Sequence, residues 1–304
     1  MCPVLCTGSS GFIGSHLVKT LTDSGEDVIA LVRDLNPSSR WLTEALGRSI
    51  VVLGDVRKFR LMKRIIAQYE VTHVVHCAAW SSVKTAFKNP VGVYETNILG
   101  TVNVLEACRQ VGVEKVLVMI TDKIFGEKLD ATENDPLHAS EPYATSKACV
   151  DLLCDSYRKT YGLNVIRVRP CNVYGLDLYS NRIIPNTIKK CLRNQPPIIF
   201  KGEQKSVRQY IHVADVVSAI MKLMNQYSHG AFNVCTEGVL NQADVVLEIL
   251  KQFPKLEPTY VKREHGPKEI MRQSMILTSF GWKPKYAFDK GIEETIKKFR
   301  KYAF

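Results

Sequence analysis

A phenol and an ammonium stand four residues apart at Tyr143 and Lys147, inside a stretch predicted to be helical over Tyr143–Tyr161. Positions i and i+4 share one helix face, and an ammonium stabilises a neighbouring phenolate. Tyr143 could then accept the proton of a hydroxyl group while hydride leaves the attached carbon. Tyr-x-x-x-Lys alone is common on solvated helix faces. Thr121, at the end of the preceding predicted strand, and Asn97, in a predicted long helix, strengthen the interpretation as an oxidation site.

The second chemical feature is the glycine-rich segment Thr7–Gly14, between a predicted strand, Val4–Cys6, and a predicted helix, Phe12–Ser24. Its first glycine permits a tight turn, its second lets a pyrophosphate approach the backbone, and its third lets helix and strand pack closely. The start of the helix then offers free N–H groups to phosphates. This context predicts dinucleotide binding. The residues expected to line the dinucleotide here are Gly8, Ser10, Gly11, Phe12, Ile13 and Gly14.

The end of the predicted second strand, Val28–Val32, bears on the type of cofactor. An acid at this place binds the ribose 2′-hydroxyl of NAD, whereas an arginine accommodates the 2′-phosphate of NADP. Arg33 follows the strand directly and favours NADP, while Asp34 keeps NAD possible. Further residues assigned to the cofactor are Asp55 and Val56 near the adenine, the small Ala78 and Ala79, and Asn97, Tyr143 and Lys147.

The elements that must position these residues alternate between strand and helix. Apolar strands separated by amphipathic helices indicate a parallel sheet covered on both faces. We therefore expect a doubly wound, Rossmann-type α/β fold. The predicted strands are Val4–Cys6, Val28–Val32, Ile50–Leu53, His73–Cys77, Lys115–Ile120 and Val165–Arg169, and the helices between them include Phe59–Gln68, Val93–Val111 and Tyr143–Tyr161.

After about Asn172 this regularity ends in a proline-containing stretch, which suggests a smaller, mixed α/β C-terminal domain for the substrate. The expected cofactor domain covers residues 1–172, with about 206–234 returning to it, and the expected substrate domain covers 173–205 and 235–304. Elements predicted in this half are the helices Pro185–Arg193, Val213–Met224, Gln242–Phe253 and Lys290–Tyr302 and the strand Ile198–Lys201.

Composition narrows the class of protein. The 304 residues carry 41 Lys+Arg and 30 Asp+Glu, a net charge of +11 that fits an anionic small substrate or a solvated basic surface. The basic residues are dispersed, so we expect no nucleic-acid partner. Nine cysteines without a Cys-x-x-Cys pair indicate reduced thiols and no metal site. No apolar run is long enough for a bilayer and no signal peptide is recognised, so a cytoplasmic location is expected.

These residues together resemble a known family. The glycine segment, Asn97, Thr121, the Tyr143/Lys147 pair and the segment Arg169–Gly175 are similar to the extended short-chain dehydrogenase/reductase superfamily. The segments Arg208–Asp215 and Gly281–Pro284 match its nucleotide-sugar branch, and the resemblance covers essentially the whole chain. It implies a nucleoside diphosphate sugar as substrate and a homodimer formed through the two long helices. The substrate-binding residues that it implies are Ser82, Asn172, Ile184, Pro185, Ile199 and Arg208.

The residues after Thr121 select the reaction within that branch. In 4-epimerases these positions are generally small and uncharged, whereas 4,6-dehydratases have an acid followed by Glu or Lys. Here they are Asp122 and Lys123. After oxidation at C4, a dehydratase must protonate the departing 6-hydroxyl, which suits Asp122, and remove the C5 proton, which suits Lys123. The resemblance therefore implies an NADP-dependent nucleotide-sugar 4,6-dehydratase that forms a 4-keto-6-deoxy sugar.

Several alternatives stay open at this point. The Asp-Lys pair resembles CDP-glucose and inverting UDP-N-acetylglucosamine dehydratases, whereas the strand end at Arg33 resembles GDP-mannose dehydratases, so the nucleobase is undetermined. If Asp122-Lys123 is only a solvated turn, the chain would be a 4-epimerase or a 4-keto reductase. A third possibility is a non-catalytic regulatory protein that binds the cofactor. Trp80 and Phe125 depart from the family pattern, and Trp80 leaves the identity of the sugar open.

Overall fold

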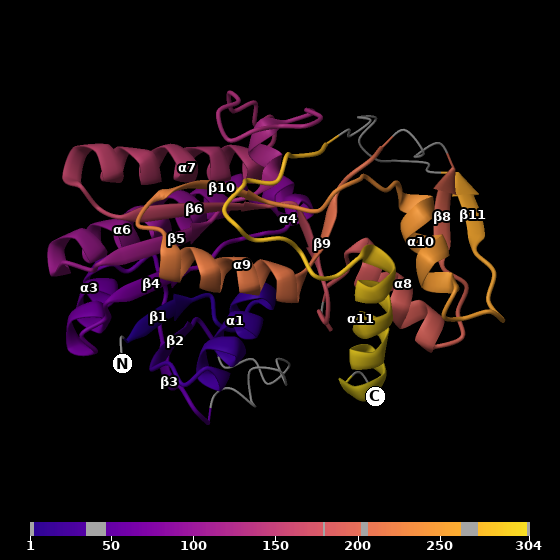
Figure 1. The fold of residues 1–304 in the computed structure, drawn as a ribbon, viewed down its shortest axis with the longest axis horizontal. Helices are drawn as coiled ribbons and strands as arrows, with labels where there is room; N and C mark the ends of the chain where they lie inside the picture. Colours follow the sequence, from indigo (N-terminus) through magenta and orange to yellow (C-terminus); the bar gives the residue numbers. More distant parts are fainter. Residues whose placement is uncertain (1–2, 35–46, 179, 202–205, 263–272, 303–304) are drawn as a thin grey trace. The chain divides into compact units, whose positions relative to one another are not determined.

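The computed structural model describes residues 3–34, 47–178, 180–201, 206–262 and 273–302, and its largest sheet is built mainly of parallel strands (Figure 1). Seven strands make one sheet in the order β10-β6-β5-β4-β1-β2-β3. The five neighbouring pairs from β6 to β3 are parallel. The strands are β1 (Val4–Thr7), β2 (Val28–Val32), β3 (Ile50–Leu53), β4 (His73–His76), β5 (Lys115–Met119), β6 (Val165–Pro170) and β10 (Gly230–Val234). The expected Rossmann-type fold is confirmed.

The chain order of the sheet reverses beside β1. From β1 the chain continues to β2 and β3 on one side, and β4, β5 and β6 then extend the sheet from the other side. In open α/β sheets, ligands bind at such a reversal, outside the carboxyl ends of the strands. The segments that follow β1 and β4 are the glycine loop and the alanine pair at Ala78 and Ala79. The topology therefore brings both predicted cofactor segments to one place.

Hydrophobic patterning explains the layers. All residues of β1 and β2 are buried, as expected for strands covered on both faces, whereas edge strand β3 is largely open. Helices α3, α6 and α7 pack side by side against the sheet (Figure 1). The helices of this part of the chain are α1 (Phe12–Asp23), α3 (Phe59–Gln68), α4 (Val83–Lys88), α5 (Pro90–Tyr94), α6 (Gly100–Val111), α7 (Pro142–Tyr161) and α9 (Val213–Gln226).

Hydrophobic spacing predicts one continuous helix over Val93–Val111, and this prediction is wrong in detail. The helical stretch begins with α5 at Pro90, and a single π turn, η1 (Glu95–Leu99), separates α5 from α6. A π turn holds one extra residue per turn and is frequent at functional sites. It contains Asn97, whose side chain makes the contacts described below. Hydrophobic spacing does not reveal such a turn.

The chain divides into two compact units. Unit 1 comprises 1–126, 133–169 and 217–232, and unit 2 comprises 127–132, 170–216 and 233–304. Residues 206–216, which the sequence analysis groups with the cofactor domain, lie in unit 2. The unit boundaries cut through α9 and β10, so each unit contains part of both. The elements that lie wholly in unit 2 are β7 (Asn172–Tyr174), α8 (Ile183–Leu192), β8 (Ile198–Lys201), β9 (Tyr210–His212), α10 (Gln242–Leu250), β11 (Thr259–Lys262) and α11 (Phe288–Tyr302). Strand β8 pairs with β11, and β7 pairs with β9.

Candidate active site

Glycine is required at two positions of the loop after β1. Gly8 has a φ of +69°, and a Cβ there would lie 2.6 Å from the backbone nitrogen of Ala78. A Cβ on Gly14 would lie 2.2 Å from the carbonyl oxygen of Gly8. The Ser9 hydroxyl donates to the Cys6 carbonyl at 2.7 Å and holds the loop against the strand. The loop therefore approaches both the segment after β4 and the first turn of α1 more closely than any side chain would permit.

The start of α1 fits a phosphate group. Exposed Gly11 is the N-cap residue, and no side chain caps it. The carbonyl of Gly11 accepts a hydrogen bond from the Ser15 N–H at 2.9 Å. The N–H groups of the first turn come before this bond and have no partner within the helix. Such groups bind anions, and a small, uncovered N-cap leaves room for one. The residues present thus fit the pyrophosphate of a dinucleotide, with Ser10, Phe12 and Ile13 half-buried beside it.

The end of β2 carries the arginine expected there. Val32 is buried, and Arg33 and Asp34 follow it as an exposed ion pair with an N–O distance of 3.5 Å. Asp55, after β3, accepts hydrogen bonds from Arg57, and this guanidinium holds the pKa of the Asp55 carboxyl below its ordinary value. The Asp55 carboxylate is thus already engaged by a neighbouring side chain in the predicted adenine position.

A chain of buried hydrogen bonds runs beneath the loop. The Thr7 hydroxyl contacts His76 Nδ1 at 2.7 Å, and His76 Nε2 contacts the Thr101 hydroxyl at 3.0 Å. Thr101 donates to the Asn97 carbonyl, and Thr7 also accepts from the backbone nitrogen of Ala78 at 3.2 Å. Burial, together with the charge of Lys147, lowers the pKa of His76 to about 3. His76 is therefore neutral at physiological pH and connects strand ends rather than binding a ligand.

Asn97 joins the π turn to the helix that carries Tyr143. Its Oδ1 accepts from the backbone nitrogen of Trp80 at 2.7 Å, and its Nδ2 donates to the Trp80 carbonyl and to the Ser146 hydroxyl at 2.9 Å. Ser146 in turn donates to the Tyr143 carbonyl at 2.7 Å. In the described structure the amide of Asn97 thus positions backbone segments next to the cofactor segments. A direct contact of Asn97 with the cofactor stays a prediction.

Tyr143 and Lys147 lie at the start of α7, as the spacing predicts. The carboxylate of the N-cap residue Glu141 accepts from the backbone nitrogens of Tyr143 and Ala144 at 2.8 and 2.7 Å, and Pro142 occupies the first helical turn. Lys147 is buried, and its Nζ donates to the Met119 carbonyl at 2.6 Å. Burial lowers the pKa of Lys147 to about 8. The ammonium is therefore close to its titration point at the pH of a cell.

Thr121, Asp122 and Lys123 follow β5 directly. Thr121 is the N-cap of a short 3-10 helix, η2 (Asp122–Phe125), and its hydroxyl donates to Asp122 Oδ1 at 2.9 Å. Asp122 is buried, whereas Lys123 is half-buried. The two residues that precede Gly126 pack into the core, and η2 packs against α7. Within unit 1, the hydroxyl, the carboxylate and the amine thus lie at the end of β5 beside the helix of Tyr143 and Lys147.

The residues predicted to bind substrate fall in both units. Ser82 caps α4 in unit 1, where its hydroxyl accepts from Thr85. The Asn172 amide donates to the Gln209 carbonyl at 3.0 Å, and the Arg208 backbone forms a bridge with Leu240. The other predicted residues of unit 2 are buried in the first turn of α8 and in β8, namely Ile184, Pro185 and Ile199. Helix α8 thus begins two residues before the predicted helix Pro185–Arg193 and includes Ile184.

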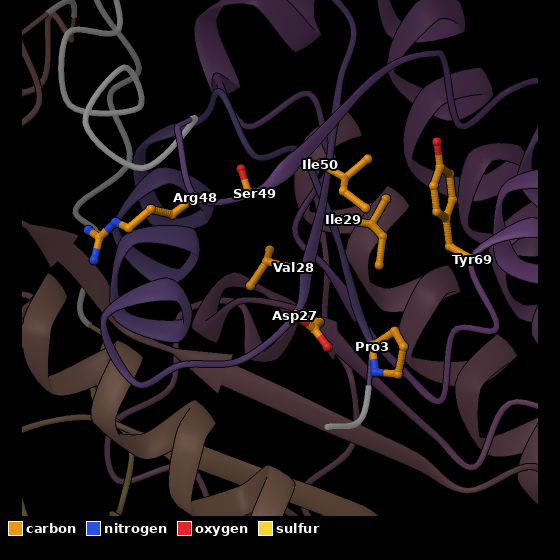
Figure 2. Close-up of a pocket in the computed structure, with 8 residues that line it drawn as sticks. All are labelled: Pro3, Asp27, Val28, Ile29, Arg48, Ser49, Ile50 and Tyr69. Atoms are coloured by element: carbon orange, nitrogen blue, oxygen red, sulfur yellow. The ribbon is translucent and has the colours of Figure 1, made fainter.

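A hollow of about 210 Å³ lies away from these residues, at the amino-terminal ends of β2 and β3 (Figure 2). Its lining combines an apolar base with the side chains of Asp27, Arg48 and Tyr69, which come from separate elements and point in different directions in Figure 2. Arg48 is already paired with Asp23 at 2.6 Å. This hollow contains none of the candidate catalytic residues.

A buried charge cluster between α7 and β6 was not predicted from the sequence. Arg167 and Arg169 on β6 both contact the buried carboxylate of Asp151, at 2.9 and 2.8 Å. Asp151 comes four residues after Lys147 on the same helix, and Arg167 and Arg169 are two residues apart on the next strand, so they point to the same face of it. That spacing was a usable signal, because charged residues are rarely buried without a partner.

The comparisons with known proteins agree with this geometry. A family model described as the NAD-dependent epimerase/dehydratase family matches residues 4–235. The chain belongs to this family. A dTDP-D-glucose 4,6-dehydratase of Mus musculus is 28% identical over 320 residues, covering 98% of this chain and 88% of the relative. The resemblance to the nucleotide-sugar branch of the extended short-chain dehydrogenase/reductase superfamily is confirmed.

Solved structures of this family superimpose over nearly the whole chain. A UDP-glucose 4-epimerase of Thermotoga maritima with UDP-glucose has a TM-score of 0.89 at 27% identity, covering 99% of this chain and 100% of the other. A dTDP-glucose 4,6-dehydratase of Streptomyces venezuelae with NAD bound has a TM-score of 0.86 at 26% identity, covering 99% and 97%. As an enzyme of the epimerase/dehydratase family with a fitting glycine loop, this chain uses a nicotinamide cofactor.

Two further findings concern the described residues only. Every cysteine among them is a free thiol, and no cluster of His, Cys, Asp or Glu there could hold a metal ion. No helix among them is long and apolar enough to span a membrane.

Proposed function

We propose that the chain is an NADP-dependent nucleotide-sugar 4,6-dehydratase. The observation that carries this proposal is the pair Asp122 and Lys123, which directly follows Thr121 at the end of β5 and lies on η2 beside α7. An epimerase needs only a group that exchanges a proton with the 4-hydroxyl. A dehydratase also needs an acid and a base for elimination, and η2 offers one carboxyl and one amine.

The oxidation half of the reaction is assigned to Tyr143, Lys147 and Thr121. When bound, the nicotinamide takes up hydride from C4 of the sugar and later returns it to C6. The charge of Lys147 stabilises Tyr143 as a phenolate, which accepts the proton of the 4-hydroxyl and becomes a phenol. Thr121 holds the same hydroxyl by a hydrogen bond. These residues come from the end of β5 and the first turns of α7.

The elimination half is assigned to η2. The C5–H bond becomes acidic once C4 is a ketone. Lys123 removes the C5 proton, and Asp122 donates a proton to the leaving 6-hydroxyl, so that one water departs and a C5–C6 double bond forms. Hydride is returned to C6 and a proton to C5, which yields the 4-keto-6-deoxy sugar. To act as an acid, Asp122 must start the step protonated, and to act as a base, Lys123 must start it neutral.

The preference for NADP rests on Arg33. The last residue of β2, Val32, is apolar and buried, so no acid stands at the strand end itself. The Arg33 side chain is 72% exposed next to it and is available for a 2′-phosphate. Asp34 shares this arginine in an exposed ion pair, which is worth little and is easily exchanged for a phosphate.

The substrate and assembly proposals follow the resemblance. Asn172 and Arg208 would bind the diphosphate, with Ile184, Pro185 and Ile199 near the nucleobase and Ser82 near the sugar. We also infer a homodimer, because large apolar side chains are exposed on α4, α5, η1 and α7, elements that contact one another. These side chains are Phe87, Val91, Leu99, Leu152 and Tyr161. The cytoplasmic location stays a prediction.

A 4-epimerase is the second candidate, favoured by the similarity to the Thermotoga maritima UDP-glucose 4-epimerase. Incubation of the protein in D₂O with NADP, NAD and a panel of nucleotide sugars distinguishes the two. The panel contains CDP-glucose, GDP-mannose, UDP-N-acetylglucosamine, dTDP-glucose and UDP-glucose. Mass spectrometry should show loss of one water with one deuterium retained for one member. An unchanged mass with an altered sugar configuration would instead identify an epimerase.

A further inference from the structure

Arg169, near the end of β6, makes contacts in three directions although it is only 3% exposed. Its Nε and Nη2 donate to the two oxygens of Asp151, each at 2.8 Å. Its Nη1 donates to the Glu133 carbonyl at 3.1 Å. Its guanidinium carbon lies over the ring of Phe125, 5.3 Å from the centroid. One planar, forked side chain thus joins α7, the segment before α7 and η2.

Both ends of this connection belong to the catalytic elements. Tyr143, Lys147 and Asp151 stand at i, i+4 and i+8 of α7, so they share one face of the helix, and all three are buried. Phe125 is the last residue of η2, the helix that starts with Asp122. Arg169 therefore links the face that carries the oxidation residues to the helix that carries the elimination residues.

Arg169 contacts η2 through the ring of Phe125. Beyond it, Gly126 turns the chain with a φ of +65°, and its N–H donates to the Lys123 carbonyl at 3.2 Å. His138 donates its N–H to the Ile124 carbonyl at 2.8 Å. A short 3-10 helix has weak internal hydrogen bonds, so its placement depends on such outside contacts. Displacing Phe125 would move Asp122 and Lys123 while leaving α7 in place.

We propose that Arg169 is a positioning residue that fixes η2 relative to α7 and thereby aligns the elimination step with the oxidation step. This inference rests on the dehydratase function proposed above. It predicts an effect on one step only, because Tyr143 and Lys147 have their own supports in Glu141, Ser146 and Met119. A displacement of about 1 Å can slow a step about 100-fold.

Arg167 offers a matched control. It contacts the same carboxylate, Asp151, at 2.9 Å, and it lies 3.5 Å from Asp155. It is 17% exposed on the same strand, and it forms ion pairs with these two acids. Arg167→Lys and Arg169→Lys therefore each keep a positive charge next to Asp151, and only the second removes the paired hydrogen bonds to both Asp151 oxygens and the planar contact with Phe125.

The experiment compares the wild type with Arg169→Lys and Arg167→Lys in a single turnover. The absorbance of the reduced cofactor follows oxidation, and mass spectrometry follows water loss. In Arg169→Lys we expect oxidation within about 3-fold of the wild type and elimination at least about 10-fold slower, so that reduced cofactor accumulates. In Arg167→Lys both rates should stay within about 3-fold. Equal slowing of the two steps in Arg169→Lys, or no slowing, would overturn the proposal.

Hydrogen exchange provides a second readout that does not depend on turnover. Amides of residues 122–126 should exchange faster in Arg169→Lys than in Arg167→Lys, while amides of α7 keep their wild-type rates. Unchanged exchange at η2, or faster exchange throughout unit 1, would contradict a positioning role. If the wild type removes no water from any nucleotide sugar, the proposed function fails, and the exchange data alone then decide whether Arg169 positions η2.

Discussion

Replacing Lys147 with methionine should remove a pH dependence from the stability of the folded protein. Burial lowers the pKa of Lys147 from its usual 10.5 to about 8, because a charge is costly away from water. A pKa lowered from 10.5 to about 8 corresponds to a free-energy cost of about 3 kcal/mol for the charged form. The charged Lys147 next to Tyr143 therefore destabilises the folded state by this amount. Methionine removes the cost and also removes the hydrogen bond to the Met119 carbonyl, worth about 1.5–3 kcal/mol.

The sign of the effect follows from proton binding. Below pH 8 the lysine is charged in both states, and the full cost is present. Between pH 8 and 10.5 the unfolded chain holds the proton that the folded chain has lost, so wild-type stability rises with pH. Relative to Lys147→Met, the free energy of unfolding of the wild type should increase by about 1.4 kcal/mol from pH 7 to pH 9, and by about 2.5 kcal/mol by pH 10.

Urea unfolding of both proteins at pH 7, 8, 9 and 10, with reducing agent to protect the thiols, measures this difference. Other titrating groups are common to both proteins and cancel when the two free energies are subtracted. At pH 7 the two stabilities should lie within about 2 kcal/mol, because the burial cost and the lost hydrogen bond oppose each other. A difference that stays constant from pH 7 to 10 would refute the argument that burial sets the protonation of Lys147.

Three further predictions concern the reaction, the cofactor and the assembly. Asp122→Asn should form product at least about 100-fold more slowly, measured by mass spectrometry, while reduced cofactor accumulates, measured by absorbance. If the rate of oxidation fell by the same factor as the rate of product formation, Asp122 would have no specific role in elimination. Arg33→Ser should weaken NADP binding about 10-fold with little effect on NAD binding, and Arg48→Ser, at another exposed arginine, is the control. Calorimetry measures both affinities, and equal losses of affinity for the two cofactors would disprove the assignment. Leu152→Lys should shift the protein from dimer to monomer in sedimentation, whereas Leu247→Lys on α10, equally an exposed leucine, should not.

Much of the cofactor half could be predicted from the sequence because local rules govern it. The glycine spacing indicated the loop, and Gly8 and Gly14 prove to be sterically required. The spacing of Tyr143 and Lys147 placed both on one helix face. The bounds of most strands agree within one or two residues, since a buried parallel strand is a short apolar run between turn signals.

What the sequence did not reveal depends on contacts distant along the chain. The π turn at Glu95–Leu99 has no signature in hydrophobic spacing, because it is defined by hydrogen bonding and positioned by the contacts of Asn97 with Trp80 and Ser146. The positioning role proposed for Arg169 depends on contacts of β6 with α7 and η2, which the sequence does not show. The small strands of unit 2 pair with partners 38 and 61 residues away, as in Asn172 with Tyr210 and Ile198 with Thr259.

The fate of the hydrogen on C4 tests the central claim most directly. A nucleotide sugar that turns over in the panel should be prepared with deuterium at C4 and incubated in ordinary water with the protein. A 4,6-dehydratase should form a product that has lost one water and carries the deuterium at C6, seen by NMR as a CH₂D methyl group. Deuterium that returns to C4 of an intact sugar would rule out the dehydratase reaction and would make the chain an epimerase.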